Sequence, residues 1–376
     1  MVVLVVVQLV AFCVVAHGLS SSSSSSSQNN RLFLDQQEAM ARQAAHEEAV
    51  FGGTERELVV PKAVRVAASK VKRGSGFAGG RQSPAEKEAA ARAKVLAREG
   101  VLKMPGLGRD TAAKLRAAVL SEIDEAREAV KLRPETSMSR FHAREEQKLR
   151  SFVLLPLRRD EGLDDPIVSA TAELLGEGTP LGDLYEKLCG PEAVLYDFYG
   201  LRTEPGSFRQ PIHSDTPFQR VPPLYASFVA LQDVDLDMGP TTFLPGTHTE
   251  TDARLDFDVG MLDGRRDAML AKAKPKFALL EAGDLVIFDM RVLHFGAANH
   301  PDKGATRIFL NLTFRNPRAN ADNLGHIPCI RPGFVNRFTL RDIRCQLKSD
   351  APFDRAGTGL PPLSPAARIE RQARVA

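Results

Sequence analysis

Residues 283–296 read GDLVIFDMRVLHFG, and this stretch contains the pattern that decides the fold. Gly283 and Asp284 are typical of a turn, and the apolar run after them is typical of a buried strand that ends close to His294. Four similar β-rich runs are bounded by Gly, Pro and Asp: residues 194–201, 225–234, 277–281 and 308–315. Short strands at this spacing predict an antiparallel sandwich or barrel rather than a sheet of alternating strands and helices.

Helices are predicted on the N-terminal side of most of these strands. Asp110 and Thr111 are suited to cap a helix, and apolar residues then recur every three or four positions. Two shorter helical stretches follow at residues 166–175 and 181–188, and residues 152–157 read as one more buried strand. The expected fold class is therefore mainly β with flanking helices.

The sequence divides into four parts. Residues 1–18 resemble a signal peptide, because the apolar run of residues 2–15 is shorter than the ~20 residues of a membrane span. An uncleaved anchor is the alternative. Residues 19–97 begin with a serine tract and are predicted to be a disordered, targeting or linker region. A folded domain is expected over residues 98–317, followed by a Pro-rich C-terminal extension over residues 318–376.

The leader is expected to direct the chain into the secretory pathway. A signal followed by a Ser-rich and then a basic stretch is similar to the two-part leader of algal proteins imported into complex plastids. It also fits a spacer in a secreted or endomembrane protein, and the sequence leaves both destinations open. No stable membrane span is expected after signal cleavage.

The net charge of +3 is unevenly distributed along the chain. Residues 61–85 contain six basic residues and no acidic one, so the rest of the chain is slightly acidic. This distribution argues against a nucleic-acid partner. The four cysteines show no C-x-x-C spacing, which argues against a structural zinc site and against a dense disulfide framework.

Four His-x-Asp/Glu steps occur in the chain, and on a strand the two side chains of such a step face the same side. They begin at His46, His213, His248 and His300. The first lies in a helical stretch, the third in a turn and the fourth in a polar loop. The step from His213 to Asp215 stands at the mouth of the β-rich half, so these two residues are the best metal-ligand candidates.

A third ligand and an anion-binding residue follow along the chain. His294 completes a set of two imidazoles and one carboxylate, which suits Fe(II) with open positions but also a zinc hydrolase. Arg307 begins an apolar strand thirteen residues later. A guanidinium at the mouth of an apolar barrel needs an anion, and a dicarboxylic cosubstrate would satisfy it. A strand-end arginine on the surface is the alternative.

Five segments, in order, resemble the phytanoyl-CoA dioxygenase family of Fe(II)/2-oxoglutarate oxygenases. They are residues 99–107 (EGVLKMPGL), 213–215 (HSD), 230–234 (ALQDV), 238–248 (MGPTTFLPGTH) and 283–294 (GDLVIFDMRVLH). The resemblance covers about residues 98–317. It implies a double-stranded β-helix, a cupin-like jelly roll of two antiparallel sheets with flanking helices.

The resemblance also implies the roles of individual residues. It assigns iron binding to three residues, with no catalytic residue beyond the metal centre: His213, Asp215 and His294. It assigns binding of the distal carboxylate of 2-oxoglutarate to Arg307. Arg315 is the alternative, because a polar insert around residues 300–304 places Arg307 farther from the last histidine than is usual in the family. Gln210 is expected to contact the cosubstrate or the substrate.

The implied activity is that of a 2-oxoglutarate-dependent dioxygenase, a hydroxylase. Fe(II), 2-oxoglutarate and O2 are used, with ascorbate as a reductant, and succinate and CO2 are released as a C–H bond is hydroxylated. Asp215 favours hydroxylation, because related halogenases carry a small residue at that position. A small or lipid-like substrate is expected. A non-catalytic jelly-roll binding module and a hydroxylase of a protein side chain are the alternatives.

Overall fold

The computed structural model describes most of the chain from residue 83 to residue 348 and short stretches before it. The described residues are 38–39, 41–50, 56–59, 83–142, 149–157, 165–249, 251–259 and 263–348. The predicted signal peptide, most of the predicted linker and the end of the C-terminal extension lie outside them. Among the helices of the described part, none combines the length and the apolar character that a membrane crossing requires.

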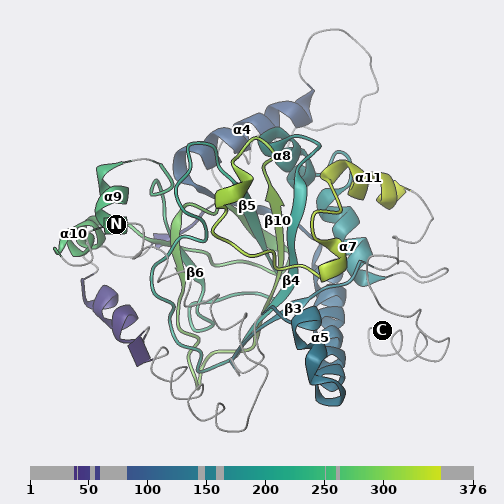
Figure 1. The fold of residues 1–376 in the computed structure, drawn as a ribbon, viewed down its shortest axis with the longest axis horizontal. Helices are drawn as coiled ribbons and strands as arrows, with labels where there is room; N and C mark the ends of the chain where they lie inside the picture. Colours follow the sequence, from purple (N-terminus) through teal and green to yellow (C-terminus); the bar gives the residue numbers. More distant parts are fainter. Residues whose placement is uncertain are drawn as a thin grey trace.

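Two β-sheets form the centre of the molecule (Figure 1). The larger sheet has six strands in the order β2 (Val101–Pro105), β8 (Asp284–Asp289), β5 (Leu224–Ala230), β10 (Arg307–Arg315), β4 (Val194–Thr203) and β3 (Arg150–Leu154). The smaller sheet has the order β1 (Arg56–Glu57), β7 (Lys276–Phe277), β6 (Thr241–Leu244) and β9 (Leu293–Gly296). All pairings are antiparallel except that of β1 with β7.

The predicted fold class of antiparallel sheet with helices is confirmed at this level. Alternation along β8 shows how the sequence builds the layers. Leu285 and Ile287 join the core cluster that contains the helices, whereas Val286 and Phe288 join the cluster shared with the smaller sheet. The apolar run in the opening stretch is therefore continuous because both faces of this strand are buried.

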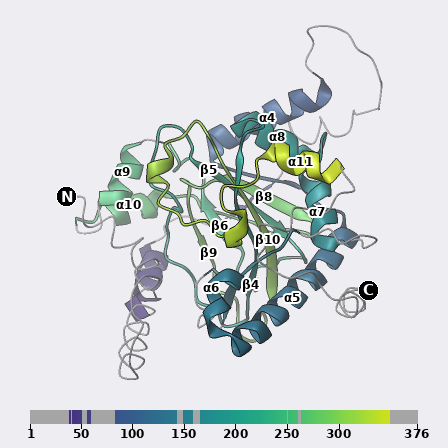
Figure 2. The ribbon, with the colours of Figure 1, turned by 45° about the vertical axis from the view of Figure 1, so that its right-hand side comes forward.

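Helices cover the outer face of the larger sheet. They are α4 (Pro84–Glu99), α5 (Arg109–Leu132), α7 (Pro166–Leu175), α8 (Pro180–Cys189) and α11 (Leu340–Lys348). The side chains of Asp165 and Thr179 cap α7 and α8, and a proline follows each cap at the first helical position. On the other side, α9 (Asp252–Val259) and α10 (Arg265–Lys272) lie beyond the smaller sheet (Figures 1 and 2).

The packed structure extends past both predicted domain boundaries. A capping box at Ser83 and Glu86 begins α4, and Leu96 of this helix is 1% exposed in the main core, although a linker was predicted up to residue 97. In the C-terminal extension, Phe334 and Ile343 are buried in the same core. Both segments have few apolar residues, so the sequence shows no clear apolar periodicity there. Each segment nevertheless buries a few large side chains in the core.

Candidate metal centre

The backbone brings the two predicted histidine ligands side by side. The main chain of His213 forms an antiparallel bridge with His294 of β9. The His213 N–H donates to the His294 carbonyl at 3.0 Å, and the His294 N–H donates back at 2.8 Å. The Asp215 N–H donates to the Met290 carbonyl at 3.0 Å, which fixes the carboxylate beside both rings.

Both imidazoles are oriented by their other nitrogen. Nδ1 of His213 lies 2.8 Å from the Pro211 carbonyl and Nδ1 of His294 lies 3.1 Å from the Val292 carbonyl, so each Nδ1 carries the proton. The Nε2 lone pairs therefore face Asp215, at 3.6 Å and 3.5 Å from its two carboxylate oxygens.

These three residues fit a metal ion. Their ligand atoms all lie within 4.8 Å of one another. Atoms bound at about 2.0–2.2 Å to one ion stand about 3 to 3.6 Å apart, which matches the nitrogen–oxygen separations. Two neutral nitrogens and one carboxylate form the facial set of non-haem iron. Within the described part of the chain, no other group of three His, Cys, Asp or Glu side chains meets the same distance criterion.

The surroundings keep His294 neutral and dry. The pKa of His294 is lowered to about 4, chiefly by burial; the Asp215 carboxylate opposes the shift, and His213 contributes to it. The rings of Phe243 and Phe288 lie 5.7 Å and 5.2 Å from the His294 ring, one from each sheet. A neutral imidazole is the form that can donate a lone pair to a metal.

The other three His-x-Asp/Glu steps have structural contacts, as their sequence context predicted. Nε2 of His248 lies 3.0 Å from the Ala97 carbonyl in a turn. His300 accepts two backbone N–H groups in its loop at 3.1 Å. His46 lies on a helical segment and pairs with Asp267 at 2.9 Å on the surface.

Arg307 is a buried guanidinium with no carboxylate partner among the described residues. It is 2% exposed and donates to the Gly239 carbonyl and, at 3.4 Å, to Oγ1 of Thr203. Its Nε has no hydrogen-bond partner in the part of the chain that the structure describes. Burial lowers the pKa of Arg307 to about 9, and nearby Arg150 adds to the shift. The guanidinium remains charged at neutral pH and is available to an anion.

Arg150 is the residue that sequence reasoning missed. In the larger sheet it pairs with Thr203, which on its other side pairs with Arg307, so the three side chains share one face. Arg150 donates a long hydrogen bond, 3.4 Å, to the Phe208 carbonyl, and desolvation lowers its pKa to about 10. The signal was present, because Arg150 begins an apolar strand just as Arg307 does.

Gln210 lies against the strand β9 that carries His294. Its Oε1 accepts the Gly296 N–H at 2.9 Å, two residues after His294. A Cβ on Gly296 would lie 2.8 Å from that oxygen and 3.5 Å from Nη2 of Arg150, so a glycine is needed for this close approach. Arg315 is at the opposite end of β10, paired with Leu224, and does not join this group.

A polar row occupies the inner face of the larger sheet next to these groups. Asn311 and Tyr199 are cross-strand partners, both buried. Asp197 accepts the Cys329 N–H at 2.7 Å and pairs with His326 at 3.2 Å, which brings a residue from the C-terminal extension into the interior. Neither Asp197 nor His326 carried a signal in the sequence, because their partners lie about 130 residues away.

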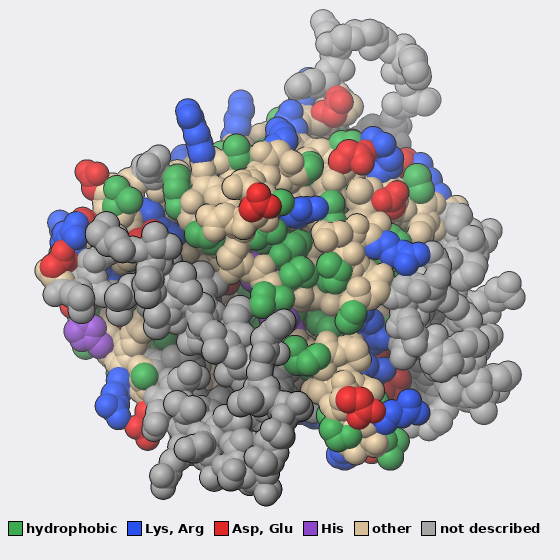
Figure 3. All heavy atoms as spheres, viewed as in Figure 1, with side chains coloured by type: hydrophobic (Ala, Val, Ile, Leu, Met, Phe, Trp, Pro, Cys, Tyr) green, Lys and Arg blue, Asp and Glu red, His purple; other side chains and the backbone are tan. Residues whose placement is uncertain are grey.

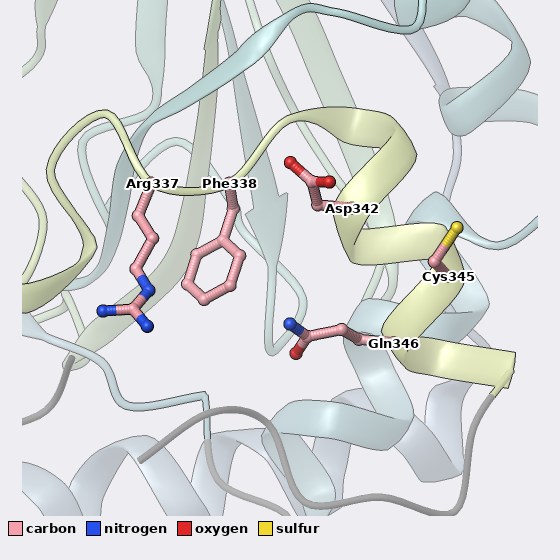
Figure 4. A pocket seen from close by; sticks show the side chains of 5 residues that line it. All are labelled: Arg337, Phe338, Asp342, Cys345 and Gln346. Atoms are coloured by element: carbon pink, nitrogen blue, oxygen red, sulfur yellow. The ribbon is translucent and has the colours of Figure 1, made fainter. Parts of the chain in front are cut away.

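A surface pocket lies apart from these groups. Figure 4 shows the side chains that line it, Arg337, Phe338, Asp342, Cys345 and Gln346, all from the C-terminal segment. It contains none of the three candidate metal ligands and neither Arg307 nor Arg150. On the face drawn in Figure 3, hydrophobic side chains gather near the centre, with charged side chains towards the upper and outer edges.

Comparison with known families decides what kind of protein carries this site. Residues 98–308 match the family described as phytanoyl-CoA dioxygenase (PhyH). The chain belongs to the phytanoyl-CoA dioxygenase family. As a member of this family, it is a 2-oxoglutarate-dependent non-haem iron dioxygenase whose cofactor is iron and whose cosubstrate is 2-oxoglutarate. No curated protein sequence matches the chain.

Solved structures of low identity resemble this member of the phytanoyl-CoA dioxygenase family. The α-ketoglutarate-dependent epimerase SnoN from nogalamycin biosynthesis is 19% identical, with 62% of this chain and 82% of that chain covered and a TM-score of 0.42. EctD from S. alaskensis, solved with 2-oxoglutarate and 5-hydroxyectoine, is 16% identical, with 77% and 93% covered and a TM-score of 0.42. AviO1 from Streptomyces viridochromogenes Tue57 is 20% identical, with 62% and 96% covered and a TM-score of 0.39. At these scores the family match alone carries the assignment.

Proposed function

We propose that this dioxygenase hydroxylates a C–H bond of a small or lipid-like molecule and releases succinate and CO2. The observation that carries the proposal is the convergence of two Nε2 atoms and one carboxylate, with both Nδ1 atoms tied to backbone carbonyls. We also propose that the two sheets form a jelly roll around this centre.

His213, Asp215 and His294 would hold the iron. When bound, iron supplies the one-electron and O2 chemistry that the protein side chains lack. These side chains would leave a face of the ion open, because three ligands converge there among the residues that the structure describes. Asp215 fills the position that a halide would need, which supports hydroxylation.

Arg307 and Arg150 would bind the distal carboxylate of 2-oxoglutarate. They lie on the same face of the sheet, Arg307 buried and Arg150 partly buried, and neither has a carboxylate partner among the described residues. A carboxylate would relieve the repulsion between the two guanidiniums and satisfy their fork of N–H groups. Gln210 would contribute its amide to the same end of the cosubstrate, since its Oε1 is already used by Gly296.

The substrate would enter beside the row that contains Tyr199 and Asn311. The hydroxyl and the amide can donate or accept hydrogen bonds, and the Phe228 ring beside them is apolar. This mixture supports a small molecule that carries at least one polar group on a mainly apolar skeleton. It supports a discrete small ligand more than an extended peptide or a binding module without chemistry.

Succinate formation tests the proposal. Purified protein supplied with Fe(II), ascorbate and 2-oxoglutarate should release succinate slowly alone and faster with a fitting substrate from a panel of lipids, acyl-CoAs and small metabolites. Asp215→Ala should abolish both rates. Absence of succinate under every condition, together with no binding of iron or 2-oxoglutarate, would refute the proposal.

We further propose that residues 1–18 act as a signal peptide, with a secreted, endomembrane or plastid destination. The apolar run and the small residues at its end support this proposal. A fluorescent fusion to residues 1–97 would locate the protein, and a cytosolic signal would contradict the proposal.

A further inference from the structure

We propose that Glu47 is a positioning residue of the metal centre. The helical segment of residues 41–50 would then be part of the working dioxygenase, although it lies upstream of the family match at residues 98–308. This inference rests on the proposed function, because it concerns how the iron ligands are held. The sequence predicted only a linker at this position.

The backbone of residues 212–213 forms hydrogen bonds on two sides. On one side, His213 exchanges both backbone hydrogen bonds with His294. On the other side, Ile212 donates its N–H to Oε2 of Glu47 at 2.8 Å, and its carbonyl accepts from Arg266 at 3.4 Å. Two side chains thus take the place of the next strand and satisfy an edge that would otherwise be unpaired.

Glu47 is held firmly enough to fix that edge. It is 1% exposed and forms ion pairs with Arg266 and, at 3.2 Å, with Arg209. The ion pairs and hydrogen bonds of Glu47 offset the cost of burying its carboxylate. The Arg209 guanidinium lies 3.9 Å from the centroid of the Phe295 ring, so the same cluster touches both metal-bearing segments.

Apolar packing reinforces this contact. Along β9, His294 points into the site, whereas Leu293 and Phe295 point outward into a separate cluster. That cluster also contains Ile212 and side chains from α9 and α10, and Val50 packs against it. In Figures 1 and 2 the purple helical segment lies close to α10. The segment therefore backs the strand from the side opposite the metal ligands.

One consequence concerns maturation. Signal cleavage after residue 18 would leave Glu47 in place, whereas a cut between residue 50 and α4 would detach it from the domain. A fully active mature form should therefore retain residues 41–50.

The experiment compares Glu47→Gln and Glu47→Ala with Glu48→Gln, an exposed neighbour on the same helix. Hydrogen exchange of residues 209–213 is measured in the metal-free, full-length protein, and Co(II) affinity is measured by its visible absorption. Faster exchange and a Co(II) affinity lower by roughly tenfold or more are expected for Glu47→Ala, since groups that orient ligands typically have effects of this size. Glu47→Gln should show a smaller loss of Co(II) affinity. Glu48→Gln should match the unmodified protein in both hydrogen exchange and Co(II) affinity.

Unchanged exchange and unchanged Co(II) affinity in both Glu47 variants would overturn the inference, even if their melting temperatures fell. If Glu47→Ala does not fold, Glu47→Gln and Arg266→Gln carry the same test. If the unmodified protein itself binds no Co(II), the proposed function fails, and the exchange of residues 209–213 still reports whether Glu47 fixes this edge.

Discussion

Replacing Arg307 with glutamine should separate cosubstrate binding from folding. In the free protein this guanidinium is 2% exposed and donates only to the neutral oxygens of Gly239 and Thr203, so no described carboxylate offsets the desolvation of its charge. A bound carboxylate supplies that compensation. The variant should therefore bind 2-oxoglutarate poorly while its metal-free fold is nearly unchanged.

The magnitude follows from one charge-assisted interaction. Hydrogen bonds to charged groups contribute about 1.5–3 kcal/mol, and each 1.4 kcal/mol is a factor of about ten. The KM for 2-oxoglutarate should rise roughly 10- to 150-fold, towards the lower end if Arg150 continues to bind the carboxylate. The unfolding free energy should change far less than the about 3–5 kcal/mol lost when one partner of a buried ion pair is removed.

Succinate formation at varied 2-oxoglutarate concentration measures the KM. Calorimetric titration of the metal-loaded protein with 2-oxoglutarate measures its dissociation constant. Arg315→Gln is the matched control, because Arg315 lies at the other end of the same strand. A KM unchanged in Arg307→Gln but raised in Arg315→Gln would show that the reasoning chose the wrong arginine. A large loss of stability in Arg307→Gln would show that the guanidinium is a structural residue.

Three further predictions concern neighbouring residues. Gly296→Ala should weaken 2-oxoglutarate binding with little change in melting temperature, because the added Cβ displaces the Gln210 amide; wild-type KM values would contradict this. Asp215→Ala should lower succinate formation to background. If added chloride restores turnover in this variant and a halogenated product forms, the carboxylate decides the reaction type. Burial alone lowers the pKa of His326, but Asp197 raises it above its ordinary value, so the pair stabilises the fold fully below about pH 6.5 and loses this effect as pH rises through the folded-state pKa. His326→Gln should therefore lower the melting temperature more at pH 5.5 than at pH 9, and an equal loss at both would refute the assignment.

The clustering of His213, Asp215 and His294 could be predicted because its signal is local. His213 and Asp215 are two residues apart on an extended segment, and His294 follows an apolar run whose strand is buried on both faces. The antiparallel layers followed from the same short runs. Arg307 was also within reach, as an arginine that begins an apolar strand.

Long-range partners explain what the sequence could not show. Glu47 is buried only because Arg209 and Arg266 meet it from 162 and 219 residues away. Read alone, its stretch of Ala, Glu and Gln is an ordinary polar leader. The pairing of Asp197 with His326 likewise depends on the path of the C-terminal extension, and no periodic pattern in the sequence predicts that path.

We propose that His213, Asp215 and His294 hold one iron ion through two Nε2 atoms and a carboxylate. Anaerobic equilibration of the metal-free protein with Fe(II) and 2-oxoglutarate, followed by a count of bound iron per chain, tests it most directly. We predict one tightly bound iron in the unmodified protein and none in His294→Ala at the same free concentration. Equal iron in both proteins, or none in either, would contradict the account.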